Sequence, residues 1–251
     1  MKPKPSFSFQ KQYTDESDST NKTIVRSLSE RHLPEGYLLQ AAFQTDGKGQ
    51  GQASWESEAG KNLLFSFVLR PKALEIQRQF YISVIVSLAL QQTVRELLPD
   101  MEVRIKWPND IYVGDKKIAG ILIENAIRGT RFEWVLTGVG LNVNQTEFVS
   151  GAPNPVSLKM LTGKNFDINK ILLVFEKYFA AYYADLCAGQ YEKLKSAYLQ
   201  LMYRRGIWAC FCDRDERIFE GRIDGIDSFG FLRIETRAGM RTFDVKEVEY
   251  K

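Results

Sequence analysis

The stretch KWPNDIYVGDKKIAG, residues 106–120, decides how the middle of the chain folds. Two short apolar runs of strand length flank Gly114-Asp115, a pair suited to a two-residue hairpin turn. This turn pairs Val113 with Lys116 and Tyr112 with Lys117. Period-two alternation then predicts one face that carries Asp110, Tyr112, Lys117 and Ala119, and an opposite face that carries Ile111, Val113 and Ile118.

The polar face of this hairpin is a candidate site. Asp110 and Lys117 become diagonal neighbours about 7–8 Å apart at Cα, with room between them for a ligand group rather than a direct salt bridge. A carboxylate and an ammonium so placed suit a magnesium-bound phosphate and a reacting carboxylate. Pro108 stiffens the turn before Asp110, and Gly120 would let a ligand approach the backbone. The alternative is an exposed hairpin whose charges are solvated.

The segments around the hairpin predict an α+β fold. Strands are expected at 37–44, 62–69, 103–107, 110–113, 116–127 and 132–143, and helices at about 20–29, 74–98, 168–186 and 191–203. Strands that cluster without regular helix alternation favour a mixed or antiparallel sheet flanked by helices. From Ile207 onward, short strands split by glycine-containing turns are typical of a small β-barrel. We therefore expect a first domain over residues 1–205 and a second over 206–251.

Composition and charge narrow the class of protein. The net charge of +3 arises from 34 basic and 31 acidic residues spread along the chain, which predicts neither nucleic acid nor membrane as a partner. Apolar runs stay shorter than the roughly 18 residues of a spanning helix, and Met1 to Tyr13 lacks signal-peptide character. The cysteines, Cys187, Cys210 and Cys212, lack zinc-site spacing. A cytoplasmic location is the resulting expectation.

A glycine-rich loop follows the strand that ends at Gln44. Its sequence, TDGKGQGQASWES over residues 45–57, has alternating glycines whose N–H groups can curl around an anion, and Lys48 adds a positive charge. The loop matches neither the P-loop spacing nor the dinucleotide-binding fingerprint. It is therefore either a phosphate-gripping loop or a flexible surface loop.

The strand before Asn142 ends in the sequence TGVGLNVN, residues 137–144. An asparagine there can pair with a purine edge, although a turn-forming asparagine is the commoner explanation. His32 is the only histidine, and neither Ser19 nor Cys187 lies in a nucleophile-elbow context. Acyl transfer by positioning and electrostatics is thus favoured over an enzyme-bound intermediate.

Taken in order, six segments of the chain resemble the biotin–protein ligases. They are 18–21 (DSTN), 47–55, 60–63 (GKNL), 106–110 (KWPND), 117–120 (KIAG) and 138–142 (GVGLN). The resemblance implies a catalytic domain of the class II aminoacyl-tRNA-synthetase-like type and an SH3-like C-terminal barrel. It implies ATP-dependent conversion of biotin into biotinyl-5'-AMP and transfer of biotin to a lysine of a biotin carboxyl carrier protein or domain, usually that of acetyl-CoA carboxylase.

The resemblance also implies the site residues, with ATP and Mg²⁺ as substrate and activator and with no tightly bound cofactor. Catalytic roles fall to Lys117, Asp110 and Lys48, with Asp110 on the magnesium. Biotin-binding roles fall to Ser19, Thr20, Asn21, Gln44, Gly47, Lys48, Gly49, Gln50, Lys117 and Gly120. ATP-binding roles fall to Lys48, Gln50, Trp55, Lys106, Asn109, Asp110, Lys117 and Asn142.

The chain departs from this family in its glycine loop and at its N-terminus. Many members have arginines where this sequence has Lys48, Gln50 and Ala53, so we expect the adenylate to be held less tightly. The segment before Ser19 is too short for a helix-turn-helix domain, so operator binding is not expected. A lipoate or octanoate ligase or transferase and a non-catalytic biotin-binding relative are the competing interpretations, and a homodimer is left open.

Overall fold

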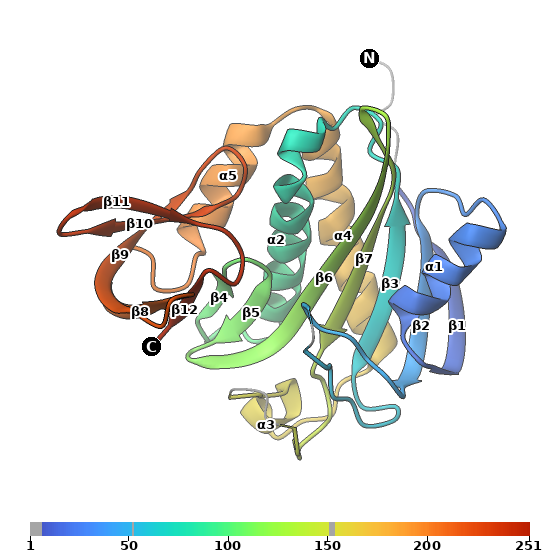
Figure 1. Ribbon diagram of the computed structural model, residues 1–251. Coiled ribbons are helices and arrows are strands. Elements are labelled where there is room, and N and C mark those ends of the chain that lie inside the picture. Colours follow the sequence, from blue (N-terminus) through green and yellow to red (C-terminus); the bar gives the residue numbers. More distant parts are fainter. Residues whose placement is uncertain (1–6, 52, 151–153) are drawn as a thin grey trace.

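The computed structural model describes residues 7–51, 53–150 and 154–251. Within these residues, seven strands form a mixed sheet in the order β1-β2-β3-β7-β6-β5-β4 (Figure 1). β1 runs parallel to β2, and the remaining neighbours are antiparallel. The strands are β1 (Gln10–Ser17), β2 (Tyr37–Gln44), β3 (Leu63–Leu69), β4 (Val103–Lys106), β5 (Asp110–Val113), β6 (Lys116–Arg128) and β7 (Arg131–Leu141).

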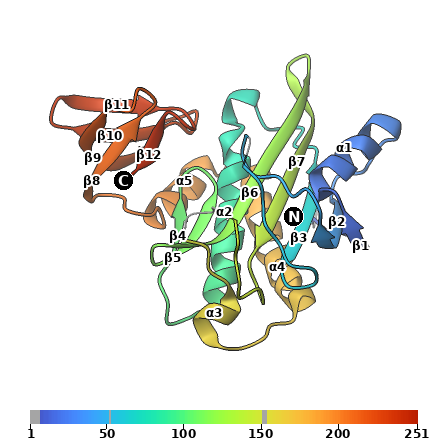
Figure 2. The same ribbon diagram turned by 60° about the horizontal axis from the view of Figure 1, so that its bottom comes forward.

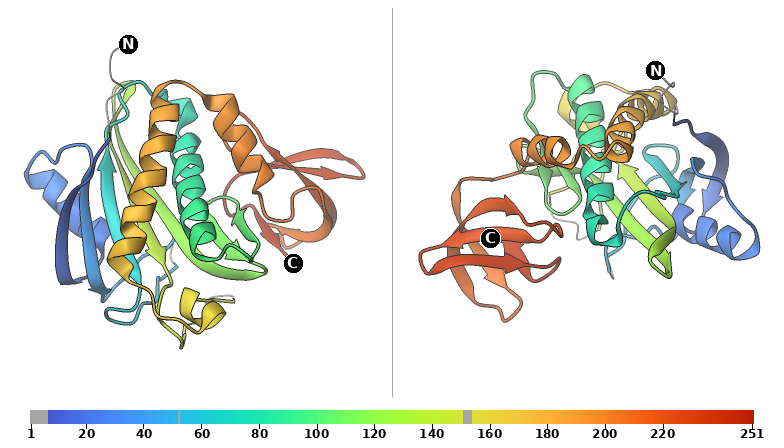
Figure 3. Two further views of the ribbon diagram at one scale, coloured as in Figure 1. Left: turned by 180° about the vertical axis from the view of Figure 1, so that it is seen from behind. Right: turned by 90° about the horizontal axis from the view of Figure 1, so that it is seen from above.

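Helices lie on both faces of this sheet. α2 (Phe80–Leu97), α4 (Ile168–Cys187) and α5 (Tyr191–Gln200) cover one face (Figure 3), and α1 (Thr20–Glu30) packs on the other. β3 is therefore buried on both sides. Leu63, Phe65 and Phe67 belong to the large core under α2 and α4, whereas Val68 belongs to the small core under α1. A polar residue on the second face of β3 thus points toward α1 and not into the main core.

The C-terminal part forms a second, smaller sheet. Its described strands run antiparallel in the order β11-β10-β9-β8-β12, and they lie at the end of the large sheet opposite to α1 (Figure 1 and Figure 2). The indole Nε1 of Trp107 donates to the Gly230 carbonyl across the junction at 2.9 Å. The strands are β8 (Trp208–Asp213), β9 (Ile218–Ile226), β10 (Leu232–Thr236), β11 (Gly239–Phe243) and β12 (Val248–Tyr250).

The observed elements confirm the α+β fold class, with three local differences. β1 lies in the polar N-terminal segment, for which the apolar pattern predicted no strand. The pattern missed it because its side chains are mostly exposed at the sheet edge. The helix predicted from Leu74 begins only at Phe80, after a 3₁₀ turn at Ile76–Arg78. A short helix, α3 (Leu158–Thr162), was not predicted; its N-cap Ser157 accepts from Met160 N at 3.1 Å.

The prediction for Ala119 is wrong. Val113 pairs with Lys116 and Tyr112 with Lys117 as the turn predicts, but the register then shifts between Ile111 and Tyr112. This irregularity places Ala119 opposite Ile111, in the apolar core. Strict alternation fails because a bulge adds one residue to one strand and exchanges the faces beyond it. Gly120, not Ala119, therefore lies opposite Asp110.

Three further features bear on the class of protein. Among the helices of the described residues, none has both the length and the apolar character that crossing a membrane requires. The same residues contain no group of three or more His, Cys, Asp or Glu side chains that is arranged to hold a metal ion. Cys187 and Cys210 are exposed free thiols, and Cys212 is half-buried.

Candidate active site

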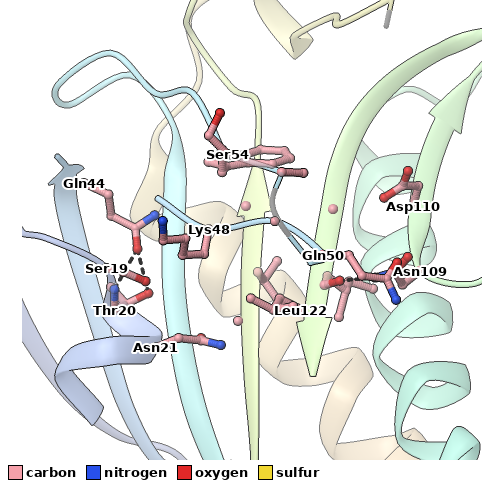
Figure 4. Close-up of a pocket in the computed structure, with 18 of the residues that line it drawn as sticks. Ser19, Thr20, Asn21, Gln44, Lys48, Gln50, Ser54, Asn109, Asp110 and Leu122 are labelled. Carbon is pink, nitrogen blue, oxygen red and sulfur yellow. Dashed lines mark hydrogen bonds between the residues drawn. The ribbon is translucent and has the colours of Figure 1, made fainter. Parts of the chain in front are cut away.

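A cavity of about 200 Å³ lies between the start of α1, the glycine loop and the strands β6 and β7 (Figure 4). Most of the residues that the sequence predicted for a site meet here. Its lining consists of Ser19, Thr20, Asn21, Gln44, Lys48, Gly49, Gln50, Ala53, Ser54, Trp55, Pro108, Asn109, Asp110, Lys117, Gly120, Ile121, Leu122, Gly138, Val139 and Gly140.

One end of the cavity is a buried polar network at the start of α1. Ser19 is the N-cap of this helix, and Thr20 and Asn21 form its first turn. Gln44, the last residue of β2, accepts with Oε1 from Thr20 N at 2.7 Å and lies 3.0 Å from Thr20 Oγ1. Ser19, Thr20 and Asn21 are each at most 4% exposed. This end is therefore formed from hydrogen bonds that hold its side chains in place before any ligand binds.

Two residues that sequence reasoning missed complete this network. Ser66 Oγ lies 2.6 Å from Thr20 Oγ1 and 2.6 Å from Asn21 Oδ1, and Asn21 Nδ2 donates to Glu124 Oε2 at 2.6 Å. Gly138 leaves room for the Asn21 amide, because a β-carbon there would overlap it. The available signal was Ser66 itself, a hydroxyl in the middle of the otherwise apolar strand LLFSFVL.

The other end of the cavity is the β5–β6 hairpin, where Asp110 and Lys117 meet. Lys117 Nζ lies 2.8 Å from Asp110 Oδ1, so the prediction of a gap without a direct salt bridge is wrong. The lysine side chain is long enough to span a diagonal pair, and the bulge turns Asp110 toward Gly120. Both side chains are about one quarter exposed, so the pair can face a ligand in the cavity.

The glycine loop folds as a short hairpin over this end. Trp55 N donates to Gly47 O at 2.9 Å, Gly49 N donates to Ala53 O at 2.8 Å, and Lys48 forms an isolated bridge with Ser54. Lys48 Nζ lies 2.9 Å from Asp46 Oδ1, and Lys22 also pairs with this carboxylate. The two lysines, Lys22 foremost, lower the pKa of Asp46. The charge of Lys48 is thus shared with an acid of its own loop.

Trp55 connects the loop to the sheet. Gly120 of β6 pairs with Gly140 of β7, and their bare backbones form a flat surface on which the indole ring lies. A β-carbon at Gly140 would overlap the ring. Lys117 Nζ lies 5.8 Å from the ring centroid, and the buried indole Nε1 has no hydrogen-bond partner among the described residues. The close approach that Gly120 permits is made by this tryptophan.

Two of the predicted ATP-binding residues lie outside the cavity lining. Lys106 Nζ lies between the rings of Tyr112 and Tyr250, at 4.9 and 4.8 Å from their centroids, and burial lowers its pKa. Asn142 is buried just after β7, where its Nδ2 donates to Val156 O at 3.1 Å. Its Oδ1 lacks a partner within the described part of the chain. Asn109 does line the cavity, and its Nδ2 donates to Ile121 O.

A second cavity of about 570 Å³ adjoins the first across the glycine loop, because Lys48, Gly49 and Gln50 line both. Its far wall comes from loops that join strands of the C-terminal sheet, at residues 229–231 and 244–245. The loop therefore separates an inner cavity from an outer one that reaches the second domain. Such an arrangement can bind one end of a carboxylic acid at the polar end of the inner cavity. It can then place the carboxylate of that acid beside Lys117 and beneath the loop that carries Lys48.

Comparisons with known proteins agree with this geometry. The model of the biotin/lipoate A/B protein ligase family matches residues 13–142, and the model of the biotin protein ligase C-terminal domain matches residues 211–249. The chain is 32% identical to the bifunctional ligase/repressor BirA of Bacillus spizizenii, over 94% of this chain and 73% of that protein. It is 30% identical to the biotin–[acetyl-CoA-carboxylase] ligase of Paracoccus denitrificans, over 92% of this chain and 97% of that one.

A solved structure shows the same fold. The biotin protein ligase from Aquifex aeolicus, in complex with biotin and ATP, superposes with a TM-score of 0.81 at 24% identity, over 96% of this chain and 99% of that one. The family models and the two relatives therefore place the chain in the biotin/lipoate A/B protein ligase family, within its biotin–protein ligases.

Proposed function

We propose that this enzyme converts biotin and ATP into biotinyl-5'-AMP and pyrophosphate and then transfers biotin to a lysine of a biotin carboxyl carrier protein or domain. The observation that carries the proposal is that a single cavity has a polar end and a charged end. Polar side chains from α1 and β2 lie at one end, and the Asp110–Lys117 pair lies at the other beneath the glycine loop. The name of the Paracoccus relative supports acetyl-CoA carboxylase as the source of the carrier.

At the polar end, the ureido ring of biotin would hydrogen-bond Ser19, Thr20, Asn21 and Gln44. These residues offer hydroxyl oxygens and amide groups at a buried end of the cavity. A buried polar group without a hydrogen-bond partner costs free energy, so the site discriminates strongly against acids that lack matching groups. The valeryl chain would pass Gly47 and reach Lys117. This placement gives the acid a fixed end and a reacting end.

In the first step, a biotin carboxylate oxygen forms a bond to the α-phosphorus of ATP, and the bond to pyrophosphate breaks. Negative charge that builds on the phosphoryl oxygens would be stabilised by Lys117 and Lys48 and by the backbone N–H group of Gln50 in the loop. Trp55, Asn109 and Asn142 would complete the ATP site, whereas Lys106 lies between two tyrosines outside the cavity lining. The unpartnered Oδ1 of Asn142 suits the amino group of adenine.

Asp110 is the residue suited to magnesium. A single carboxylate at a cavity wall fits this ion, which is usually held by one or two carboxylates together with substrate phosphates and water. Bound there, magnesium would neutralise phosphate charge. Removing divalent cations with EDTA should abolish adenylation, and added Mg²⁺ should restore it.

In the second step, the neutral amine of the carrier lysine forms a bond to the acyl carbon, the bond from that carbon to the AMP oxygen breaks, and the nitrogen loses a proton as AMP leaves. As far as the described residues go, neither cysteine nor histidine lines the inner cavity, which supports direct transfer from the adenylate over a covalent enzyme intermediate. The same observation argues against an octanoate transferase that would use a cysteine nucleophile.

Exchange of labelled pyrophosphate into ATP tests the proposal, with biotin, lipoate and octanoate compared in parallel. Biotin-dependent exchange is expected, followed by a mass increase of a carrier domain by one biotin. Exchange only with lipoate or octanoate would favour the competing ligase, and biotin binding without exchange would favour a non-catalytic relative. No exchange with any acid would rule out the enzyme as proposed.

The domain division belongs to the same proposal. We place the catalytic domain at residues 1–205 and an SH3-like domain at 206–251, supported by the start of β8 at Trp208 and by the family match at 211–249. A cytoplasmic setting fits the free cysteines. Limited proteolysis near the boundary, followed by mass spectrometry of the fragments, tests the division.

A further inference from the structure

Glu124 touches the acid-binding network from outside the inner cavity. It lies on β6 and lines the outer cavity, and its Oε2 accepts from Asn21 Nδ2 at 2.6 Å. Asn21 is 4% exposed, whereas Glu124 is exposed to solvent. A charged group in this position favours one orientation of the Asn21 amide, because its oxygens accept hydrogens and cannot donate them.

The orientation of the Asn21 amide decides the direction in which the Ser66 hydroxyl donates. Ser66 Oγ lies 2.6 Å from both Asn21 Oδ1 and Thr20 Oγ1, and Thr20 Oγ1 also lies 3.0 Å from Gln44 Oε1. These are three oxygen–oxygen contacts. Each hydroxyl has one hydrogen to donate, so the two hydroxyls can satisfy only two of them.

With the amide nitrogen toward Glu124, Ser66 Oγ donates to Asn21 Oδ1 and Thr20 Oγ1 donates to Gln44 Oε1, so the contact between Thr20 and Ser66 has no hydrogen. Gln44 Oε1 also accepts from the Thr20 backbone N–H at 2.7 Å. With the amide reversed, its nitrogen donates to Ser66, Ser66 donates to Thr20, and Thr20 donates to Gln44. All three contacts become hydrogen bonds. The reversed arrangement therefore gains one hydrogen bond inside the network.

The carboxylate of Glu124 outweighs this gain. In the reversed arrangement the Asn21 oxygen would face a negatively charged oxygen with no hydrogen between them, and a charge-assisted hydrogen bond would be lost. Such a bond is about twice as strong as the neutral one gained. Without the charge at Glu124, the Asn21 amide would adopt the reversed orientation.

The two arrangements present opposite groups of the Asn21 amide to a ligand. In the observed one, the Asn21 nitrogen points toward the cavity (Figure 4) and can donate, while Thr20 Oγ1 donates its hydrogen to Gln44 Oε1 and keeps a lone pair that can accept. A donor beside an acceptor matches a ureido group, whose oxygen accepts and whose N–H groups donate. We propose that Glu124 is a positioning residue that sets the hydrogen-bond polarity of the biotin pocket through Asn21. This inference rests on the proposed function.

The test compares wild type with Glu124→Gln, which keeps the shape of the side chain and removes its charge. We expect the KM for biotin to rise about tenfold, with the KM for ATP changed by less than about twofold. Inhibition by 2-iminobiotin, in which a protonated imino donor replaces the ureido oxygen, should strengthen relative to biotin binding. A residue needed only for packing would leave this preference unchanged.

Two controls separate the polarity from other effects. Glu133→Gln makes the same change on β7, outside the lining of either cavity, and should behave as wild type. In an Asn21→Ala background, Glu124→Gln should have no further effect on the KM for biotin, since its influence passes through Asn21.

Wild-type values for Glu124→Gln in both biotin KM and 2-iminobiotin preference would overturn the inference. So would an effect that persists without Asn21. Failure of the proposed function looks different, because wild type itself would then show no biotin-dependent exchange.

Discussion

The two ends of the inner cavity are stabilised in different ways. At the α1 end, Thr20 and Asn21 are almost fully buried and Ser66 is completely buried, so their hydrogen bonds are shielded from water. At the glycine loop, Lys48 and Asp46 are each more than 40% exposed, and ion pairs this exposed stabilise little. The hydrogen bonds of the first end are formed before the acid binds, whereas the second end is stabilised mainly when a charged ligand binds. Acid specificity and adenylate retention are thus separable properties of one cavity.

The largest effect is expected from Lys117→Ala. Loss of the ammonium at the reacting carboxylate should lower biotin-dependent pyrophosphate exchange by about 10²–10³-fold. The free energy of unfolding should change by no more than about 1 kcal/mol, because the pair with Asp110 is partly exposed. Denaturant titration measures the second quantity. Lys116→Ala, one residue earlier and exposed, is the matched control; normal exchange by Lys117→Ala would remove this lysine from the mechanism.

A more selective loss is expected from Thr20→Val, which removes one hydroxyl from the buried end. The KM for biotin should rise by about 10- to 50-fold and the unfolding free energy should fall by about 1–3 kcal/mol, since Gln44 and Ser66 each lose a partner. The KM for ATP should stay nearly constant. Thr23→Val deletes a hydroxyl from the same helix outside the cavity. An equal rise in both KM values would contradict the separation of the two ends.

A smaller change in the opposite direction is expected from Gln50→Arg in the loop. A guanidinium can bind the phosphate of biotinyl-5'-AMP more tightly than an amide, so release of the adenylate should slow by about three- to tenfold. Trapping the released adenylate from preloaded enzyme gives this rate, and the KM for biotin should not move. Gln12→Arg, exposed on β1, controls for the added charge. Unchanged release would show that the loop composition does not limit retention.

The smallest effect concerns Asp18, just before the N-cap of α1. Arg26, through a hydrogen-bonded ion pair, lowers the pKa of this carboxyl well below its usual value. The charged form therefore stabilises the folded state at neutral pH, and this contribution is lost as the pH falls below about 4. Asp18→Asn should cost no more than about 1 kcal/mol at pH 7. Its unfolding curve should converge with that of wild type in acid; a constant difference would mean that the charge is not responsible.

Much of the fold follows from the sequence because buried strands and helices leave strong apolar patterns. β2 begins and ends where predicted, at Tyr37 and Gln44, and the turn at Gly114-Asp115 sets the expected pairs. β1 escaped because an exposed edge strand needs no apolar residues. Ala119 was placed on the wrong face because a bulge is a local change in the backbone that strict alternation of side chains does not predict.

The candidate site was predictable where residues are adjacent in the chain and not where distant strands meet. Ser19, Thr20 and Asn21 form one helical turn and could be found as a group. Ser66 and Glu124 join them only through the fold. α1 packs on the face of β3 that carries Ser66, and β6 places Glu124 within hydrogen-bond distance of Asn21. Lys106, although next to Trp107 in the same motif, lies instead between two tyrosines at the junction with the second domain.

The indole of Trp55, resting on Gly120 and Gly140, gives the molecule an optical property. Tryptophan emission depends on how much water surrounds the ring, and of the four tryptophans this is the one that lines the described cavity. A ligand that lifts the ring from its glycine surface, or seals it further, changes that emission. The chain thus contains a fluorescent reporter of its own loop, and stopped-flow mixing can time loop movement without any attached dye.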